Sequence, residues 1–319
     1  MSQSSDKDQD HTAGAGSPDL MQRFAFEALR EQRSARRWGI FFKLLFTGYL
    51  LALLGIGWAN SSLGSLTSAD RITALVDLQG VIAPEMPASA ENVIGGLRAA
   101  FEDKRTAAVL VRINSPGGSP VQSGYINDEI YRLKQKYPKI RLYVVIQDIC
   151  ASGAYYVAVA ADEIYADKAS LVGSIGVRMD GFGFVDALQK LGVERRLLTA
   201  GEHKAFLDPF LPLQAVEVQH VEGLLGEIHQ QFIQTVKKGR RDRLKPGVDL
   251  FNGLIWTGER GLELGLVDAL GSAGYVAREI IQAPDIVDFT RHEGVMEKVG
   301  RRLGSQLGTG VRQALGAQW

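Results

Sequence analysis

Residues 107–118 read AAVLVRINSPGG, and this stretch is the strongest indication of the fold. Ala107–Ile113 is an apolar run of strand length that ends directly in the turn NSPGG at 114–118. Helical spacing then continues through Leu133, and a second apolar strand follows at Leu142–Ile146. Apolar strands separated by amphipathic helices predict an α/β fold, with a parallel sheet covered on both faces.

The same alternation of strands and helices continues on both sides of this unit. Ile72–Leu78 reads as a strand, and Ser89–Lys104 has helical spacing with apolar side chains on one face. Downstream, the spacing predicts helices over Phe182–Leu191 and Leu213–Lys238, of which the second is long enough to project from the core. A helix between two short strands is predicted over residues 256–268.

Composition excludes several classes of protein. The chain has 319 residues, 45% hydrophobic and 23% charged, which is typical of a globular protein. Lys+Arg and Asp+Glu balance at 36 each, so the net charge favours no nucleic-acid partner. The single cysteine, Cys150, excludes a disulfide framework and a Cys-rich zinc site. Without a nucleotide-binding glycine loop or a histidine pair at i, i+4, the sequence predicts neither a metal site nor a cofactor.

An apolar run at residues 38–59 has one charged residue, Lys43. A helix of about 20 residues matches a hydrocarbon core of about 30 Å, so we expect one transmembrane helix. Arginines precede the run and no comparable cluster follows, so the positive-inside rule predicts a cytoplasmic N-terminus and a far-side location after Asn60. A cleaved signal peptide is the alternative, but the polar region before the run is unusually long for one.

These patterns divide the chain into five parts. We expect a disordered cytoplasmic tail at 1–37, the transmembrane helix at 38–59 and a polar linker at 60–70. The α/β domain then occupies 71–285, and an amphipathic tail occupies 286–319. That tail is either a helix for a membrane surface or an oligomer contact, or a frayed terminal helix.

The turn at 114–118 lies at the carboxyl end of a strand, where open α/β sheets bind ligands. Gly117 and Gly118 can adopt conformations closed to other residues, so backbone amides can approach a reacting oxygen closely. An oxyanion hole requires such an approach. A simple tight turn is the alternative, and the turn by itself does not decide between them.

A serine stands at the next junction of strand and helix, in the sequence ASGAYY at 151–156. Ser152 could be a nucleophile whose oxyanion is held by the free amides at the helix N-terminus. Taken alone, the motif favours the other interpretation, in which Ser152 is the N-cap of that helix, a very common role for serine. Because both turns end successive strands, they should emerge at the same edge of the sheet.

A nucleophilic serine needs a base, and no histidine lies between Ser152 and Gly201. Lysine is another established partner of serine, provided that burial lowers its pKa from the ordinary value of about 10.4. Lys204 is followed by apolar residues, so an apolar pocket is plausible there. The spacing alone does not distinguish it from a solvated surface lysine.

Together these segments resemble the short bacterial signal peptide peptidases of the S49 serine peptidase family. The resemblance extends from about Ile72 to Gly274 and rests on NSPGG at 114–118, ASGAYY at 151–156, LVGSIGV at 171–177 and the Lys204 segment. The first motif is shared with the wider Clp/crotonase superfamily, whereas the second and third together are specific. The resemblance implies a Clp/crotonase-like sheet of ββα units covered by helices, with the S49 peptidase domain at 71–285.

The resemblance also assigns roles to residues. It implies that Ser152 is the nucleophile, Lys204 the general base and Ser174 the serine that orients this lysine. The amides of Gly153 and of the Gly117-Gly118 turn would form the oxyanion hole. His203, directly before Lys204, remains an alternative base.

The activity implied by the resemblance is hydrolysis of cleaved signal peptides and other apolar peptides, without a cofactor. The expected partners are peptide substrates, the lipid bilayer and other copies of the chain in a ring-shaped homo-oligomer, with eight subunits as the candidate number. One site could draw its serine and lysine from neighbouring subunits. The expected location is the bacterial inner membrane, with the catalytic domain on the periplasmic side. A crotonase-like acyl-CoA enzyme and an inactive membrane scaffold are the alternative functions.

Overall fold

The computed structural model describes residues 36–55 and 70–291. The first stretch is the helix Arg36–Gly55, the one helix among the described residues that is long and apolar enough to cross a membrane. It overlaps the predicted span at 38–59, whose last four residues lie outside the described part, as do the N-terminal residues 1–35. The helix and the domain that follows are separate compact units.

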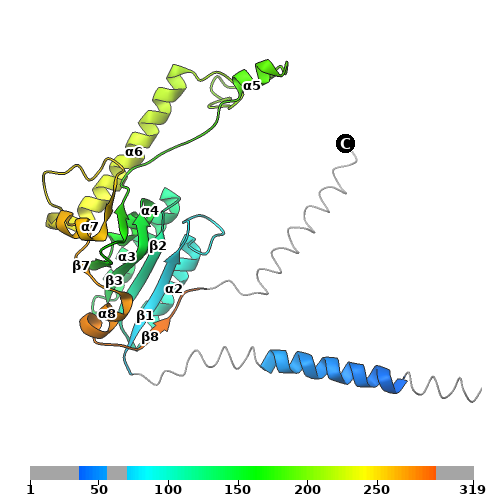
Figure 1. Cartoon of the computed structure of the whole chain (residues 1–319), viewed down its shortest axis with the longest axis vertical. Helices are drawn as coiled ribbons and strands as arrows, with labels where there is room; N and C mark the ends of the chain where they lie inside the picture. The colour runs from blue at the N-terminus through cyan, green and yellow to red at the C-terminus, as the bar shows by residue number, and fades with distance from the viewer. Residues whose placement is uncertain (1–35, 56–69, 292–319) are drawn as a thin grey trace, which may run out of the picture. The chain divides into compact units, whose positions relative to one another are not determined.

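The domain is built around one sheet of eight strands in the order β6-β5-β3-β2-β1-β8, with β4 paired to β3 and β7 paired to β4 (Figure 1). The strands are β1 (Ile72–Gln79), β2 (Thr106–Ser115), β3 (Arg141–Ala151), β4 (Glu163–Ala166), β5 (Leu171–Gly173), β6 (Ile255–Thr257), β7 (Ala269–Leu270) and β8 (Ile286–Asp288). β8 pairs with β1, so the sheet includes part of the expected C-terminal tail. Residues 292–319 of that tail lie outside the described residues.

The prediction of a wholly parallel sheet is wrong at one edge. β6 runs antiparallel to β5, whereas the other strand pairs are parallel. Between β5 and β6 the chain makes a long excursion through two helices instead of one compact crossover, so its direction of return is not restricted to parallel.

Helices follow most of the strands. They are α2 (Ala90–Glu102), α3 (Pro120–Lys136), α4 (Gly153–Ala158), α5 (Val185–Lys190), α6 (Ala215–Arg240), α7 (Gly258–Leu264) and α8 (Ala273–Tyr275), with short turns of other helix types at Arg241–Arg243 and Val276–Ile281. Hydroxyl groups cap several of them: Ser89 accepts from the Asn92 amide at the start of α2, and Ser119 accepts from the Gln122 amide at the start of α3. The predicted helices are confirmed, with shifted ends, and α6 projects beyond the sheet (Figure 1).

The sheet has two faces. The main core lies between one of them, which we call the first face, and helices α2, α3, α4 and part of α6. Alternate residues of each central strand point to it, for example Val109, Val111 and Ile113 of β2. The intervening residues, such as Leu110, point to a smaller core on the second face. Two apolar faces explain the nearly continuous apolar run that identified this strand.

The second face is covered only in part, which corrects the expectation of cover on both faces. Val276 and Ile281 pack over its amino-terminal half. Toward the carboxyl ends of the strands the side chains become polar and pair with one another: Asp77 with Arg112 at 2.7 Å, Gln79 with Gln147 at 2.8 Å and Asn114 with Asp148 at 2.8 Å. Because these side chains satisfy each other in contact with water, this half needs no covering helix.

Candidate active site

The two turns singled out in the sequence meet at the carboxyl edge of the sheet. A Cβ atom placed on Gly117 would lie 2.7 Å from the Gly153 amide nitrogen and 2.9 Å from Cβ of Ser152. Only a glycine allows the backbones to approach this closely. Both turns line a cavity of about 770 Å³.

Ser152 stands between β3 and α4 in a strained conformation, with φ 53° and ψ −124°. Such a conformation costs a residue other than glycine about 1–3 kcal/mol. Backbone hydrogen bonds hold it: the Ser152 amide donates to Gly173 O at 2.8 Å, and Ser152 O accepts from the Tyr156 amide at 3.0 Å. Although Ser152 occupies the N-cap position of α4, its hydroxyl makes no capping hydrogen bond. The N-cap interpretation therefore does not account for the hydroxyl.

The three glycines expected to form an oxyanion hole are not equivalent. The Gly117 amide already donates to Ser115 Oγ at 3.1 Å. Within residues 70–291, the amides of Gly118 and Gly153 have no acceptor. Two amides are thus available beside Ser152, and Gly117 contributes close approach of the backbone instead of a donor.

A pair of hydrogen bonds to the segment before α2 holds the glycine turn in place. The Ile82 amide donates to Gly117 O at 2.9 Å, and Ile82 O accepts from the Ser119 amide at 2.7 Å. Gly117 and Gly118 have φ values of 96° and 151°, which side chains with a Cβ rarely adopt. The free amide of Gly118 is therefore fixed before any ligand arrives.

Ser174 follows β5 and lines the same cavity as Ser152. Its backbone is also in the positive region, with φ 52°. The Ser174 amide donates to Leu254 O at 2.8 Å, which ties this segment to the chain before β6. The structure thus brings Ser174 to the same cavity as Ser152 and the two free amides.

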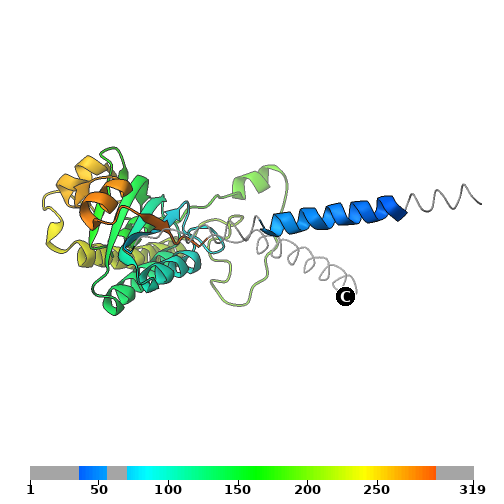
Figure 2. The ribbon, with the colours of Figure 1, turned by 90° about the horizontal axis from the view of Figure 1, so that it is seen from below.

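Lys204 lies elsewhere. It belongs to residues 177–214, which we call the arm, and Figures 1 and 2 show α5 of this arm far out from the sheet. The Lys204 side chain is exposed and does not line the cavity of Ser152, and the same is true of His203. The apolar surroundings expected for this lysine are not present within a single chain.

His229 lines the cavity and was missed by the sequence analysis. It lies on α6, and its Nε2 is 3.2 Å from Ile175 O. Because a carbonyl oxygen only accepts, Nε2 carries the proton and links α6 to the segment of Ser174. Its position three residues before the buried Phe232 places it on the inward side of the helix, a signal that helical spacing could have provided.

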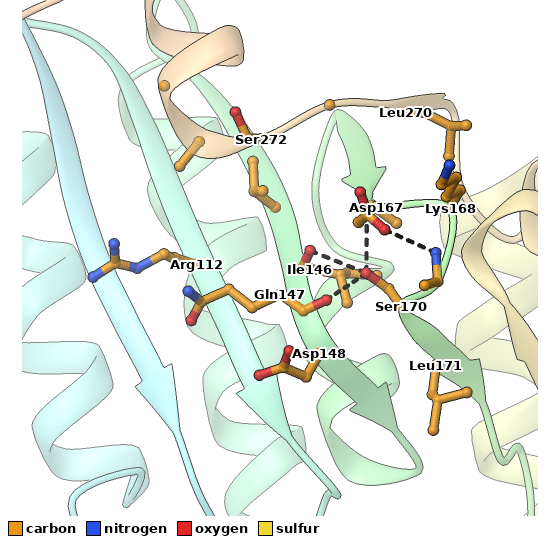
Figure 3. A pocket seen from close by; sticks show the side chains of 16 residues that line it. Arg112, Ile146, Gln147, Asp148, Asp167, Lys168, Ser170, Leu171, Leu270 and Ser272 are labelled. Atoms are coloured by element: carbon orange, nitrogen blue, oxygen red, sulfur yellow. Dashed lines mark hydrogen bonds between the residues drawn. The ribbon is translucent and has the colours of Figure 1, made fainter.

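A larger cavity of about 960 Å³ lies over the second face of the sheet (Figure 3). Two serines line it. Ser170 accepts from the Asp167 amide at 3.0 Å, and its hydroxyl contacts the carbonyl oxygens of Ile146 and Gln147, which fixes the turn before β5. The hydroxyl of Ser272 accepts from the Tyr275 amide at 3.3 Å and caps α8. The smaller cavity at Ser152 is therefore the better candidate for nucleophilic chemistry.

The other nucleophilic groups near Ser152 are inert by burial. Cys150 is fully buried, and burial raises the pKa of its thiol, so the reactive thiolate does not form. Burial likewise raises the pKa of Tyr155, whose hydroxyl donates to Leu266 O at 2.8 Å. Among residues 36–55 and 70–291, His, Cys, Asp and Glu side chains form no group of three or more suited to a metal ion.

Comparisons with known proteins identify the family of this chain. Residues 134–286 match the profile of peptidase family S49. A putative protease of Methanocaldococcus jannaschii is 31% identical over 241 residues, which are 74% of this chain and 75% of that protein. A putative signal peptide peptidase SppA of Enterococcus faecium is 31% identical over 181 residues, 57% of this chain and 52% of that protein.

A third relative carries a different name. A protein of Brucella melitensis named Na(+)/H(+) antiporter NhaA is 48% identical over 183 residues, 57% of this chain. The chain spans only 25% of the length of that protein. Most of the protein that carries the antiporter name therefore lies outside the part that matches this chain.

Proposed function

Because this chain belongs to peptidase family S49, we propose that it is a membrane-anchored serine endopeptidase that cleaves signal peptides and other apolar peptides with a Ser-Lys dyad. The observation that carries the proposal is the surroundings of Ser152. Its hydroxyl makes no capping bond, its backbone is strained, and two amides without acceptors lie beside it.

In the proposed reaction, the uncharged amine of Lys204 removes the proton of Ser152 Oγ as this oxygen attacks the peptide carbonyl carbon. The amides of Gly118 and Gly153 bind the oxygen that becomes negatively charged. The protonated lysine gives its proton to the leaving amine, and an acyl-enzyme forms. Water then attacks the ester, again with the lysine as base, and releases the second product.

We propose that Lys204 comes to Ser152 from a second copy of the chain. The support is the exposure of the arm, where apolar side chains face water in one chain: Phe182 is 81% exposed, Leu198 99% and Leu213 71%. Apolar side chains exposed along one segment favour a contact that covers them, and here we propose another chain. A ring-shaped homo-oligomer would cover the arm and remove water from Lys204. Ser174 would then accept or donate a hydrogen bond that orients this lysine.

The proposed location is a bacterial inner membrane, with Arg36–Gly55 as its single span and the domain outside the cytoplasm. Anchoring beside the bilayer would raise the local concentration of apolar peptides left there. The name of the Enterococcus relative, a putative signal peptide peptidase, supports this choice of substrate.

The test is the substitution Ser152→Ala in the full chain in detergent or lipid. We expect cleavage of apolar signal peptides to fall by about 10³-fold or more, with folding and oligomer size unchanged. Ser272→Ala is the matched control, because this serine caps α8 on the second face and should leave cleavage intact. Full cleavage by Ser152→Ala would contradict the proposal. Binding of an acyl-CoA thioester without peptide cleavage would favour the crotonase-like alternative.

A further inference from the structure

Ser123 is a buried serine whose hydroxyl has no hydrogen-bond partner. Its side chain is 0% exposed, and within residues 70–291 only Ser123 Oγ and Trp256 Nε1 are buried side-chain polar atoms without a partner. An unpaired buried hydroxyl costs about 1–3 kcal/mol. Native structures contain few such groups, and those that remain call for an explanation.

The position of Ser123 points to the reaction site. It lies in the first turn of α3, directly after the glycine turn, and it lines the cavity of Ser152. Its Oγ is 2.5 Å from the place that a Cβ on Gly153 would occupy, and the Gly118 amide nitrogen is 3.2 Å from the same place. The hydroxyl therefore lies beside the backbone of Gly153 and close to that of Gly118.

Packing explains the size of this side chain but not its hydroxyl. α3 and α4 contact each other at Gly153, where Ser123 leaves no room for a larger residue. Alanine would meet that requirement equally well, and it would not bury an unpaired polar atom. The hydroxyl must then serve a state of the protein that differs from the resting chain.

We propose that Ser123 is a third hydrogen-bond donor of the oxyanion hole, an inference that rests on the proposed function. A hydroxyl proton rotates freely about the Cβ–Oγ bond, and here no acceptor holds it in the resting chain. When the carbonyl oxygen of a substrate enters between the amides of Gly118 and Gly153 and gains negative charge, it becomes that acceptor. The proton stays on Ser123 Oγ throughout, so no covalent bond of this serine changes.

Such a donor acts in the transition state more than in the bound substrate, because its hydrogen bond strengthens as charge develops. Removing it should lower kcat and leave KM nearly unchanged. The same removal takes away an unpaired buried hydroxyl, so the resting protein should become no less stable. Lower activity together with equal or higher stability is a combination that a packing role does not produce.

The experiment compares Ser123→Ala with the unaltered full-length oligomer. We expect kcat for an apolar signal peptide to fall by about 10- to 100-fold, at or below the loss of about 10²–10³ found when an established oxyanion donor is removed. A peptide aldehyde, which forms a tetrahedral adduct with Ser152, should bind more weakly by a similar factor. The corresponding peptide alcohol, which forms no adduct, should bind as before. The Tm should stay equal or rise.

Thr73→Val is the matched control, because Thr73 is fully buried and its hydroxyl donates to Ala283 O at 2.7 Å, away from the cavity. It should lower Tm and leave kcat and aldehyde binding unchanged. An unchanged kcat for Ser123→Ala would overturn the inference. So would a lower kcat accompanied by a lower Tm and an unchanged ratio of aldehyde to alcohol affinity. If the unaltered protein cleaves no peptide, or Ser152→Ala cleaves equally well, the proposed function itself fails.

Discussion

The two halves of the proposed dyad differ in how the chain supports them. Ser152 stands at the end of β3, directly after the buried Cys150 and Ala151, and the strands around it pack against the main core. Lys204 stands on the arm, where α5 buries no residue at all. Within a single chain, Ser152 is therefore held in place by the core, whereas Lys204 is exposed to solvent.

The arm nevertheless has contacts of its own. Phe184 stacks on Phe210 with ring centroids 5.5 Å apart, and Arg195 pairs with Asp208 at 2.6 Å. These contacts hold the arm together without attaching it to the sheet. The strained part of the site thus rests on the core, whereas the segment of Lys204, which would reach another chain in the proposed oligomer, is held only by local contacts.

The largest expected effect is a loss of stability of the domain core that supports Ser152. Arg240 is 1% exposed and donates to both carboxylate oxygens of Asp268, at 2.8 and 2.9 Å. Burial alone would raise the pKa of Asp268, but the hydrogen bonds and charge of Arg240 outweigh it and hold the pKa below its ordinary value. Asp268→Ala leaves a buried arginine unpaired and should lower the free energy of unfolding by about 3–5 kcal/mol, measured by urea denaturation.

An ion pair on the arm provides the contrast to this variant. Arg196 and Glu194 are 83% and 73% exposed, and their pair at 3.0 Å is held in water. Glu194→Ala should change the free energy of unfolding by less than about 1 kcal/mol. If the two substitutions had similar effects, the difference in support between the two regions would be wrong.

A smaller effect on stability, but a clear one on assembly, is expected at the tip of the arm. Leu198 is 99% exposed in the single chain, so Leu198→Asp should change the free energy of unfolding by no more than about 0.5 kcal/mol. The mass of the Leu198→Asp protein, measured by light scattering, should fall below that of the unaltered oligomer. Its peptide cleavage should fall as well. Ile280→Asp, on the second face, is the control that should keep both. An intact, active oligomer of Leu198→Asp would show that the arm is not a subunit contact.

A further prediction concerns how the stability of the domain depends on pH. Glu129 of α3 is 8% exposed and accepts from Arg132 and Arg98. Hydrogen bonds from Arg132, and after them from Arg98, outweigh burial and lower the pKa of Glu129 from 4.5 to about 2. A lowered pKa stabilises the fold at pH above 4.5, and this stabilisation is lost as the pH falls toward 2.

Glu129→Gln should therefore lower the free energy of unfolding by about 1–2 kcal/mol at pH 7. The difference from the unaltered protein should shrink steadily between pH 4.5 and pH 2, followed by urea denaturation at each pH. A difference that stays constant over this range would contradict the role given to the ionised carboxylate.

Much of the Ser152 half could be predicted from the sequence, because its signals are local. The turn at 114–118 and the serine at 152 both end apolar strands, and parallel strands bring their carboxyl ends to one edge. The polar half of the second face was not predicted, although its residues break the apolar pattern of two strands. Asp77 and Arg112 interrupt otherwise apolar strands, yet they pair across the sheet instead of meeting a helix.

The rest depends on contacts between distant segments. That the amide of Gly117 is used and that of Gly118 is free follows from hydrogen bonds formed only in the folded chain. The missing partner of Ser123 is likewise a property of how α3 packs on α4. Lys204 was chosen through resemblance to a family, and its exposed position in one chain could not be read from its apolar neighbours in sequence.

The most direct test of the comparison mixes two inactive variants, Ser152→Ala and Lys204→Ala, in one oligomer. Each variant alone should be inactive. If serine and lysine of one site come from neighbouring chains, a mixed oligomer contains sites with both groups intact. Random mixing in equal amounts should then restore about a quarter of the unaltered activity, since a head-to-tail interface pairs different chains. Mixed oligomers, verified by two affinity tags, that remain as inactive as either variant alone would contradict the account.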